Sequence, residues 1–231
     1  MTKIAIIDID NTLWDFASIL YDRLRYQFKN SVPLPSEWHN WKFWEKFCNA
    51  DTFYKIVREI HFEQDKFSVY PDAKEFLLEL RQCGFSIVIA SHRDPQTHTA
   101  TVKWLQKHRL SFDKLHLSYD KTQLFHNCHV CVDDSPEVLK SAANKGLLAT
   151  GLEFPWNKRI NNEKNIKLFF NLSDVLSFIK SEINHWNSFI DYDCPLLKKK
   201  CFLNCVWFQN YSKCEIFGEI NSNIKGVKND K

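Results

Sequence analysis

The sequence predicts an α/β protein whose core is a parallel β-sheet. Short apolar runs, such as residues 3–7 and 86–91, lack the polar alternation of a strand that faces water. Such runs are typical of strands buried on both faces, the usual situation in a parallel sheet. They alternate with segments of helical periodicity, which predicts right-handed crossovers between parallel strands. Acidic or hydroxyl side chains follow three of the runs, at the sheet edge where such proteins bind ligands.

Composition is that of a globular protein. The chain has 231 residues, of which 44% are hydrophobic and 26% charged, enough for one packed domain and a smaller unit. The net charge of +3 permits an anionic substrate without demanding nucleic acid. No apolar stretch approaches the ~20 residues of a membrane span, and the polar start does not resemble a signal peptide. We therefore expect a cytoplasmic protein without a membrane partner, whose eight cysteines are reduced or bind metal.

The first part of the chain carries one strand and then helical segments. Residues 3–7 form the strand, which runs directly into two aspartates. Apolar side chains then recur at helical spacing, with a proline-containing break after the first helix. The helices expected here cover residues 17–28, 37–48 and 52–60. Because residues 17–68 show no strand pattern and lie between two strand-bearing regions, we expect them to form an inserted helical cap.

Regular alternation of strands and helices follows the cap. Gly84 and Gly146 mark helix ends, whereas Asp94, Ser135 and Ser173 are the expected helix N-caps. The expected strands are residues 86–91, 115–118, 130–132 and 147–150. The expected helices are residues 71–82, 95–108, 136–145 and 171–186. The predicted division is a core at residues 1–16 and 69–186, the cap at 17–68, and a Cys- and Lys-rich, partly disordered tail at 187–231.

Three of the strands end in acidic or hydroxyl side chains. Side chains alternate along a strand, so Asp8 and Asp10 project to the same side. Ser91 ends the second strand, and Asp133 and Asp134 follow the fourth. Two like charges this close repel each other unless a cation lies between them or one carries a proton. Chance explains one such strand ending well and three together poorly.

Grouped carboxylates suit Mg²⁺ and phosphoryl transfer. Mg²⁺ prefers oxygen ligands and is commonly held by carboxylates together with substrate phosphate. One carboxylate can attack phosphorus to form an aspartyl-phosphate, and a second can protonate the leaving oxygen and later deprotonate water. Lys121, which lies shortly before the fourth strand, could supply fixed positive charge.

Taken in order, the string Asp8-Ile-Asp10-Asn-Thr12, a strand-end serine, a lysine and a later Asp-Asp pair resemble the haloacid dehalogenase superfamily of phosphohydrolases. The resemblance covers about residues 3–156. It implies a Rossmann-like sheet in which Asp8 is the nucleophile and Asp10 the general acid/base. It also implies that Ser91 binds the phosphoryl group and that Lys121 steadies the aspartyl-phosphate.

The same resemblance implies a magnesium site and a supporting turn. The ion would be held by Asp8, the Asp10 carbonyl, Asp133 and Asp134. Asn11 and Thr12 would be among the residues that bind the substrate phosphate, and Thr12 would also support the active-site turn. Family members that lack the second aspartate tend not to be phosphatases, and this chain has it.

A finer resemblance is to the deoxyribonucleotidase-like branch of that superfamily. It rests on the helical cap, on Asp120-Lys-Thr122 ahead of the Asp-Asp strand, and on Phe154-Pro-Trp-Asn157 after the fifth strand. In that branch, cap aromatics stack on the base of a nucleoside monophosphate. Asn11 departs from the glycine usual at its position, and the string DIDNTLW is closer to small magnesium-dependent phosphatases that act on tyrosine phosphate or sugar phosphates.

Two groups of residues have alternative interpretations. Trp41 and Trp44, together with Trp38, recur every third residue and could stack on a base, although an aromatic stripe at helical spacing is more often packing. His92 and Arg93 follow the second strand. Arg93 could bind a phosphate through two N–H groups, or both residues could lie in a solvated loop.

The tail carries a second candidate metal site. Cys194, Cys201, Cys205 and Cys214 could bind Zn²⁺ tetrahedrally, although the paired CxxC signature is absent. Unpaired thiols in a partly ordered tail are the alternative. Lys198–Lys200 is most simply a solvated charge run.

The function we expect from the sequence is Mg²⁺-dependent phosphomonoesterase activity on (deoxy)nucleoside monophosphates. A sugar-phosphate or phosphotyrosine phosphatase is the first alternative, and a non-catalytic nucleic-acid-associated protein is the second. The expected partner is a small phosphate ester rather than nucleic acid, and the sequence leaves a homodimer open.

Overall fold

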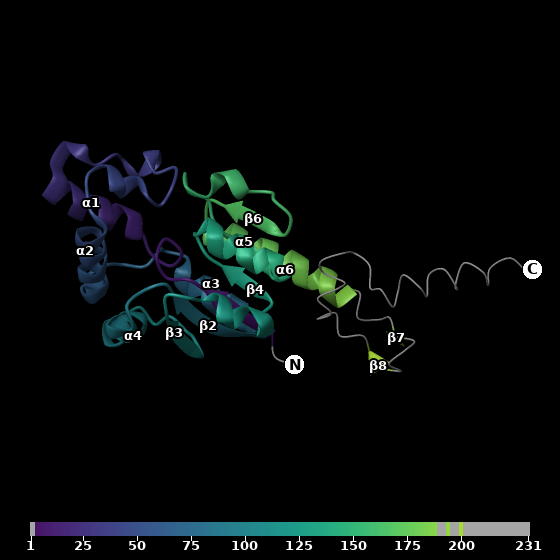
Figure 1. Ribbon diagram of the computed structural model, residues 1–231. Coiled ribbons are helices and arrows are strands. Elements are labelled where there is room, and N and C mark those ends of the chain that lie inside the picture. Colours follow the sequence, from purple (N-terminus) through teal and green to yellow (C-terminus); the bar gives the residue numbers. More distant parts are fainter. Residues whose placement is uncertain (1–2, 189–192, 195–198, 201–231) are drawn as a thin grey trace, which may run out of the picture.

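The computed structural model describes residues 3–188, 193–194 and 199–200 of the chain (Figure 1). Within them, six parallel strands form one sheet in the order β3-β2-β1-β4-β5-β6. The strands are β1 (Lys3–Ile7), β2 (Phe85–Ser91), β3 (Lys114–Leu117), β4 (Val130–Val132), β5 (Leu148–Leu152) and β6 (Ile166–Phe169). The helices are α1 (Phe16–Phe28), α2 (Ala50–Phe62), α3 (Ala73–Gln82), α4 (His98–Lys107), α5 (Pro136–Asn144) and α6 (Leu172–Ser188). The predicted Rossmann-like α/β sheet is confirmed.

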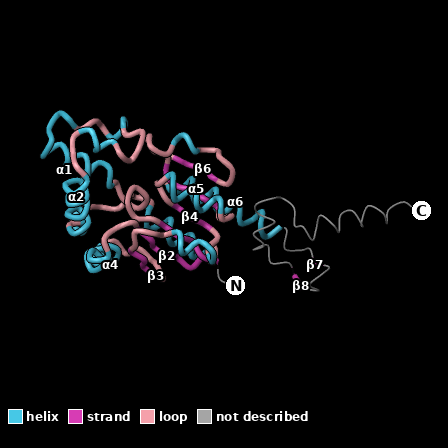
Figure 2. Tube along the Cα trace, viewed as in Figure 1, coloured by secondary structure: helices cyan, strands magenta, loops and turns pink. Residues whose placement is uncertain are grey.

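The central strand β1 is buried on both faces because helices cover both sides of the sheet (Figure 2). Ile7 belongs to an apolar cluster with residues of α3 and α6, whereas Ile6 belongs to a second cluster with residues of α5. This alternation explains why the strand shows no polar face in sequence. β1 pairs with β2 on one side and with β4 on the other.

Most helix ends lie where local signals place them. The Ser135 hydroxyl accepts from the Val138 amide, and the Asp94 carboxylate accepts from the Gln96 amide in a short 3₁₀ turn before α4. Gly84 has a φ of 85°, which stops α3. The expected cap at Ser173 is wrong, because α6 begins at Leu172 and Asn171 Oδ1 accepts from the Asp174 amide at 2.8 Å.

The cap contains α1 and α2, which stand to one side of the sheet in Figure 1. The helix expected over residues 37–48 is wrong, because only the short 3₁₀ turns Pro35–Glu37 and Phe43–Lys46 occur there. Ring packing fixes this segment instead: the Trp38 and Phe43 rings stack with centroids 3.8 Å apart. A repeat of three residues fits 3₁₀ turns as well as an α-helical face. The domain boundaries themselves stay a prediction.

Strand β6 was not predicted from the sequence. β6 lies at the sheet edge, and Ile166 and Leu168 are buried while Lys167 is not. Four residues of alternation are too few to distinguish from a loop. Within the tail, β7 (Asp193–Cys194) and β8 (Lys199–Lys200) form an antiparallel pair.

Candidate active site

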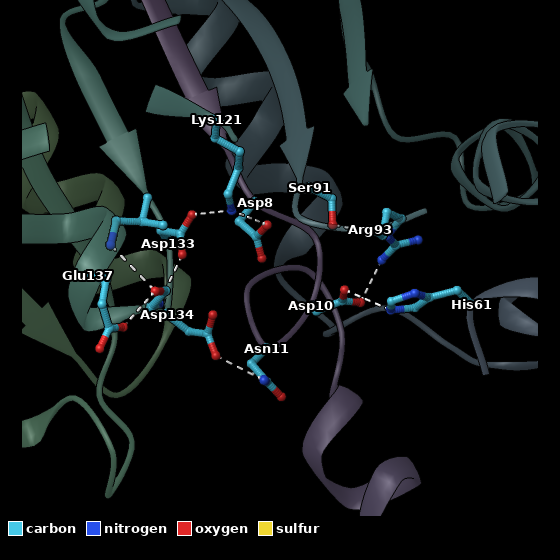
Figure 3. Close-up of polar contacts among 12 residues, drawn as sticks. Asp8, Asp10, Asn11, His61, Ser91, Arg93, Lys121, Asp133, Asp134 and Glu137 are labelled. Atoms are coloured by element: carbon cyan, nitrogen blue, oxygen red, sulfur yellow. Dashed lines mark hydrogen bonds and ion pairs between the residues drawn. The ribbon is translucent and has the colours of Figure 1, made fainter. Parts of the chain in front are cut away.

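The candidate site lies at the carboxyl edge of the sheet, at the point where the strand order reverses between β1 and β4. Asp8 follows β1, and Asp133 and Asp134 follow β4. Each of the three offers a carboxylate oxygen within 4.8 Å of the others, and all three are buried. Figure 3 shows Asp8 between the Asp133–Asp134 pair and a second group that contains Asp10. The predicted convergence of the strand ends is therefore present.

Lys121 lies at the centre of the carboxylate group. Its Nζ is 2.7 Å from Asp8 Oδ1 and 2.5 Å from Asp133 Oδ2. Burial alone would lower the pKa of Lys121, but the two carboxylates outweigh it and raise the pKa above its usual value. The lysine is thus a fixed cation at the position that the sequence analysis gave it.

The remaining negative charge is not balanced by protein groups at this position. Burial raises the pKa of Asp8 to about 7, although Lys121 acts in the opposite direction. Burial and the carboxylates of Asp133 and Asp8 raise the pKa of Asp134 well above its usual range. Three carboxylates facing one ammonium leave a deficit of two positive charges when all are ionised. An oxygen-rich set with this deficit fits a hard divalent cation such as Mg²⁺.

Asparagine side chains orient Asp134. Asn11 Nδ2 donates to Asp134 Oδ2 at 2.9 Å, while Asn11 Oδ1 accepts from the Ala17 amide at the start of α1. Asn157 Nδ2 donates to the Asp134 carbonyl at 2.9 Å. Asn11 has a φ of 54°, a conformation that Asn tolerates better than other residues except Gly. This explains the departure from glycine, because Asn supplies both the turn and two hydrogen bonds.

Asp10 lies apart from the carboxylate group and points toward the cap. Arg93 Nη2 donates to Asp10 Oδ1 at 2.6 Å, and Trp14 Nε1 donates to the same oxygen at 2.9 Å. His61 Nε2 lies 3.0 Å from Asp10 Oδ2. Burial alone would raise the pKa of Asp10, but Arg93 and His61 outweigh it and hold the pKa well below its usual range. A metal contact of Asp10 through its carbonyl stays a prediction.

The two candidate residues in the loop after β2, His92 and Arg93, lie in different environments. His92 is exposed beside Tyr119, with ring centroids 5.7 Å apart. Arg93 is 1% exposed, so the solvated-loop interpretation is wrong for it. Its Nε donates to Ser91 Oγ at 3.0 Å, and Nη1 donates to Gln64 Oε1 and Thr101 Oγ1. Because four of its five N–H groups bind protein atoms, Arg93 is built into the interior rather than free to grip a phosphate.

A cavity of about 930 Å³ lies above the site, between α2 and the sheet edge. Its wall includes Ser91 and Trp41 as well as the carboxylates. Trp41 is partly exposed, and its ring centroid is 5.4 Å from that of Trp156, which also lines the cavity. Trp44 is buried against Phe53 and does not line the cavity, so packing is its role in this structure.

Two further residues, Thr12 and Gly151, belong to closely packed parts of the site. Thr12 is fully buried beside Asn11, in the turn where it was expected. Gly151 in β5 approaches the Asp133 carbonyl so closely that a Cβ would lie 2.0 Å from the oxygen. No side chain fits there, so glycine lets β5 hold the loop that carries the two aspartates.

Sequence reasoning missed the cap residues that reach the site. His61 and Gln64 were not candidates, yet both touch the Asp10–Arg93 pair. A usable signal was present for His61, because it continues the apolar spacing of Phe53 and Val57 by one further turn of α2. Gln64 had no such signal.

The tail hypothesis largely lies outside the described residues. Cys194 lies in β7, whereas Cys201, Cys205 and Cys214 lie outside the residues that the structure describes. The described residues give the Zn²⁺ hypothesis no support. Among the described residues, no helix combines the length and apolarity needed to cross a membrane.

Comparison with known proteins identifies relatives of this chain. The family model described as "5′ nucleotidase, deoxy (Pyrimidine), cytosolic type C protein" matches residues 2–182. A "predicted phosphoglycolate phosphatase" from Haemophilus somnus is 18% identical, with a TM-score of 0.52 over 77% of this chain and 98% of that one. The HAD-family protein YfnB of Bacillus subtilis, in a magnesium-bound structure, is 15% identical, with a TM-score of 0.52 over 78% of this chain and 99% of that one. These structures share the fold. No curated protein sequence matches the chain significantly.

Proposed function

We propose that this chain, which belongs to the cytosolic type C family of 5′-deoxynucleotidases, hydrolyses the phosphate monoester of (deoxy)nucleoside monophosphates. The family lies within the haloacid dehalogenase superfamily, as the sequence motifs indicated. The observation that carries the proposal is the buried Asp8–Lys121–Asp133 arrangement at the base of a cavity with an aromatic wall.

The geometry supports two-step phosphoryl transfer through Asp8. Because Arg93 and His61 keep Asp10 ionised in this structure, the phosphate monoanion of the substrate first gives its proton to Asp10. In the first step an Asp8 carboxylate oxygen then attacks phosphorus, the bond to the leaving oxygen breaks, and that oxygen takes the proton from Asp10. In the second step a water attacks the aspartyl-phosphate, gives its proton to Asp10, and releases phosphate and the free Asp8 carboxylate. Lys121 compensates charge at Asp8 throughout, because its Nζ lies 2.7 Å from Oδ1.

The donor set also supports a magnesium cofactor. Asp8, Asp133 and Asp134 would hold the ion, since their oxygens converge within 4.8 Å and their charges exceed that of Lys121. When bound, Mg²⁺ would neutralise the oxygens of the transferring phosphoryl group. Ser91 Oγ lies on the cavity wall at the end of β2, where it can donate to a phosphoryl oxygen.

The cavity supports a nucleotide rather than a smaller ester. Its volume of about 930 Å³ is at the upper end of the ~300–1,000 Å³ typical of small-molecule sites. Trp41 offers a ring face on the cap side, and base–aromatic stacking is worth ~1–3 kcal/mol per base. Trp156 braces Trp41 from the core side and stacks on Phe154 with centroids 4.5 Å apart.

The experiment is phosphate release from deoxynucleoside and ribonucleoside monophosphates, sugar phosphates and phosphotyrosine, with Mg²⁺ or with EDTA. We expect release from a deoxynucleoside monophosphate that EDTA abolishes and added Mg²⁺ restores. Release confined to sugar phosphates or phosphotyrosine would replace the substrate and keep the mechanism. Folded protein that releases phosphate from none of them would overturn the proposal.

A further inference from the structure

The Asp10 carboxylate has neighbours at both of its oxygens, from different parts of the chain. Oδ1 accepts from Arg93 and Trp14, which belong to the core. Oδ2 lies 3.0 Å from Nε2 of His61, which is in α2 of the cap and is 2% exposed. A carboxylate bound at one oxygen can turn about its Cβ–Cγ bond, whereas a second partner at the other oxygen fixes its plane.

The cap also reaches Asp10 indirectly. Gln64, in the 3₁₀ turn that follows α2, accepts from Arg93 at 2.6 Å through Oε1. Among the residues that the structure describes, its buried Nε2 has no hydrogen-bond partner, and His61 Nε2 has no aligned hydrogen bond although it lies close to Asp10. Buried donors left this way are uncommon, and catalytic hydrogen bonds often align only when substrate is bound. A small movement of the cap relative to Asp10 would therefore be enough to align the hydrogen bond of His61.

We propose that His61 is a positioning residue for Asp10, which orients its carboxylate toward the leaving oxygen and so couples cap placement to proton transfer. The inference rests on the proposed function, in which Asp10 gives a proton to the leaving group. It differs from a packing role, although His61 also packs on Phe16 with ring centroids 5.3 Å apart. A phenylalanine at position 61 would keep this ring contact and lose the nitrogen, whereas a glutamine would keep an N–H donor.

The test compares substrates that differ in their need for a proton. A deoxynucleoside monophosphate loses an alkoxide and needs the proton, whereas p-nitrophenyl phosphate loses a stabilised phenolate and does not. The measured quantity is kcat/KM, because it reports the steps up to departure of the leaving group and excludes hydrolysis of the aspartyl-phosphate. The variants are His61→Phe, His61→Gln and the reference Asp10→Asn. Ile60→Val is the matched control, since Ile60 is its fully buried neighbour in α2 and does not line the cavity.

We expect His61→Phe to lower kcat/KM for the nucleotide roughly tenfold and for p-nitrophenyl phosphate less than about twofold. His61→Gln should recover most of the loss, Ile60→Val should change neither value, and Asp10→Asn should show the same substrate difference more strongly. Equal losses on both substrates, or no loss on either, would overturn the positioning role while the proposed function stands. Wild-type protein inactive on both substrates would overturn both.

Discussion

The two walls of the cavity are held in place by different interactions. On the sheet edge, Asp8 and Asp133 are fixed by ion pairs of 2.7 and 2.5 Å to Lys121. On the cap side, Trp41 contacts Trp156 and Phe43 through ring packing at 5.4 and 6.3 Å. Charged groups at fixed positions suit the phosphoryl group, which every candidate substrate shares. Packed rings suit the leaving group, which differs from one candidate substrate to another. The ion pairs at the sheet edge and the packed rings of the cap are therefore distinct parts of the cavity, and the contact of His61 with Asp10 is where the cap reaches the acidic residues.

The largest effect should follow a change at the sheet edge. Asp8→Asn removes the carboxylate that we propose attacks phosphorus, and it should lower phosphate release at least about a thousandfold on every substrate. Asn can still accept from Lys121, so the variant should fold, as circular dichroism can check. Asp113→Asn is the matched control, because Asp113 precedes β3 at the opposite end of the strands and should leave activity unchanged. Residual activity above a few per cent would remove Asp8 from the role of nucleophile.

A substitution at Gly151 in β5, which lies against the loop of Asp133 and Asp134, should have the next largest effect. Gly151→Ala places a Cβ 2.0 Å from the Asp133 carbonyl oxygen, so β5 or the aspartate loop must shift. We expect a loss of roughly 2–4 kcal/mol in the free energy of unfolding, measured by urea denaturation. Phosphate release measured without denaturant should also fall, by a similar factor for every substrate. Unchanged stability would mean that β5 and the aspartate loop can move apart without a measurable cost.

A change in the cap wall should affect substrates unequally. Trp41→Ala removes the ring from the cavity and should raise KM for a nucleotide about tenfold, with little change for p-nitrophenyl phosphate. Trp44→Phe is the control, because Trp44 is buried against Phe53 outside the cavity. A nucleotide KM that Trp41→Ala leaves intact would place the base elsewhere.

The smallest effect should come from the far end of the sheet. Partial burial would raise the pKa of Asp113, but hydrogen bonds from the Ile87 amide and Arg81 outweigh it and lower the pKa. A lowered pKa means that the ionised form stabilises the fold above the unfolded pKa and that this contribution is lost as pH falls below ~4. Asp113→Asn should therefore cost about 1 kcal/mol or less at pH 7 and a smaller amount at pH 3. Urea midpoints at the two pH values check this, and an equal cost at both would assign the effect to packing.

Sequence reasoning succeeded for the sheet edge and for two of the three helices expected in the cap, but not for the contacts between the cap and the site. Asp8 and Asp133 directly follow neighbouring apolar strands, so their convergence follows from parallel pairing, whereas Lys121 reaches them from the segment between β3 and β4. Periodicity places His61 on the buried face of α2, but the packing of α2 on the core, which brings His61 to Asp10, cannot be read from that spacing. The residues 37–48 show the same limit, because their ring contacts, not their backbone preferences, decide the local structure.

The strand order has a consequence for how the chain folds. β1 is made first but occupies the middle of the sheet, and it pairs with β2 and β4, which lie far along the chain. Contacts of such long sequence separation slow folding, because the loop between the partners must close before they are gained. β1 therefore has no sheet partner until β2 has been synthesised, and it lacks its second partner until β4 has been synthesised. Asp8 and Asp133 come together only when β4 docks, so catalytic competence should be among the last properties that a nascent chain acquires.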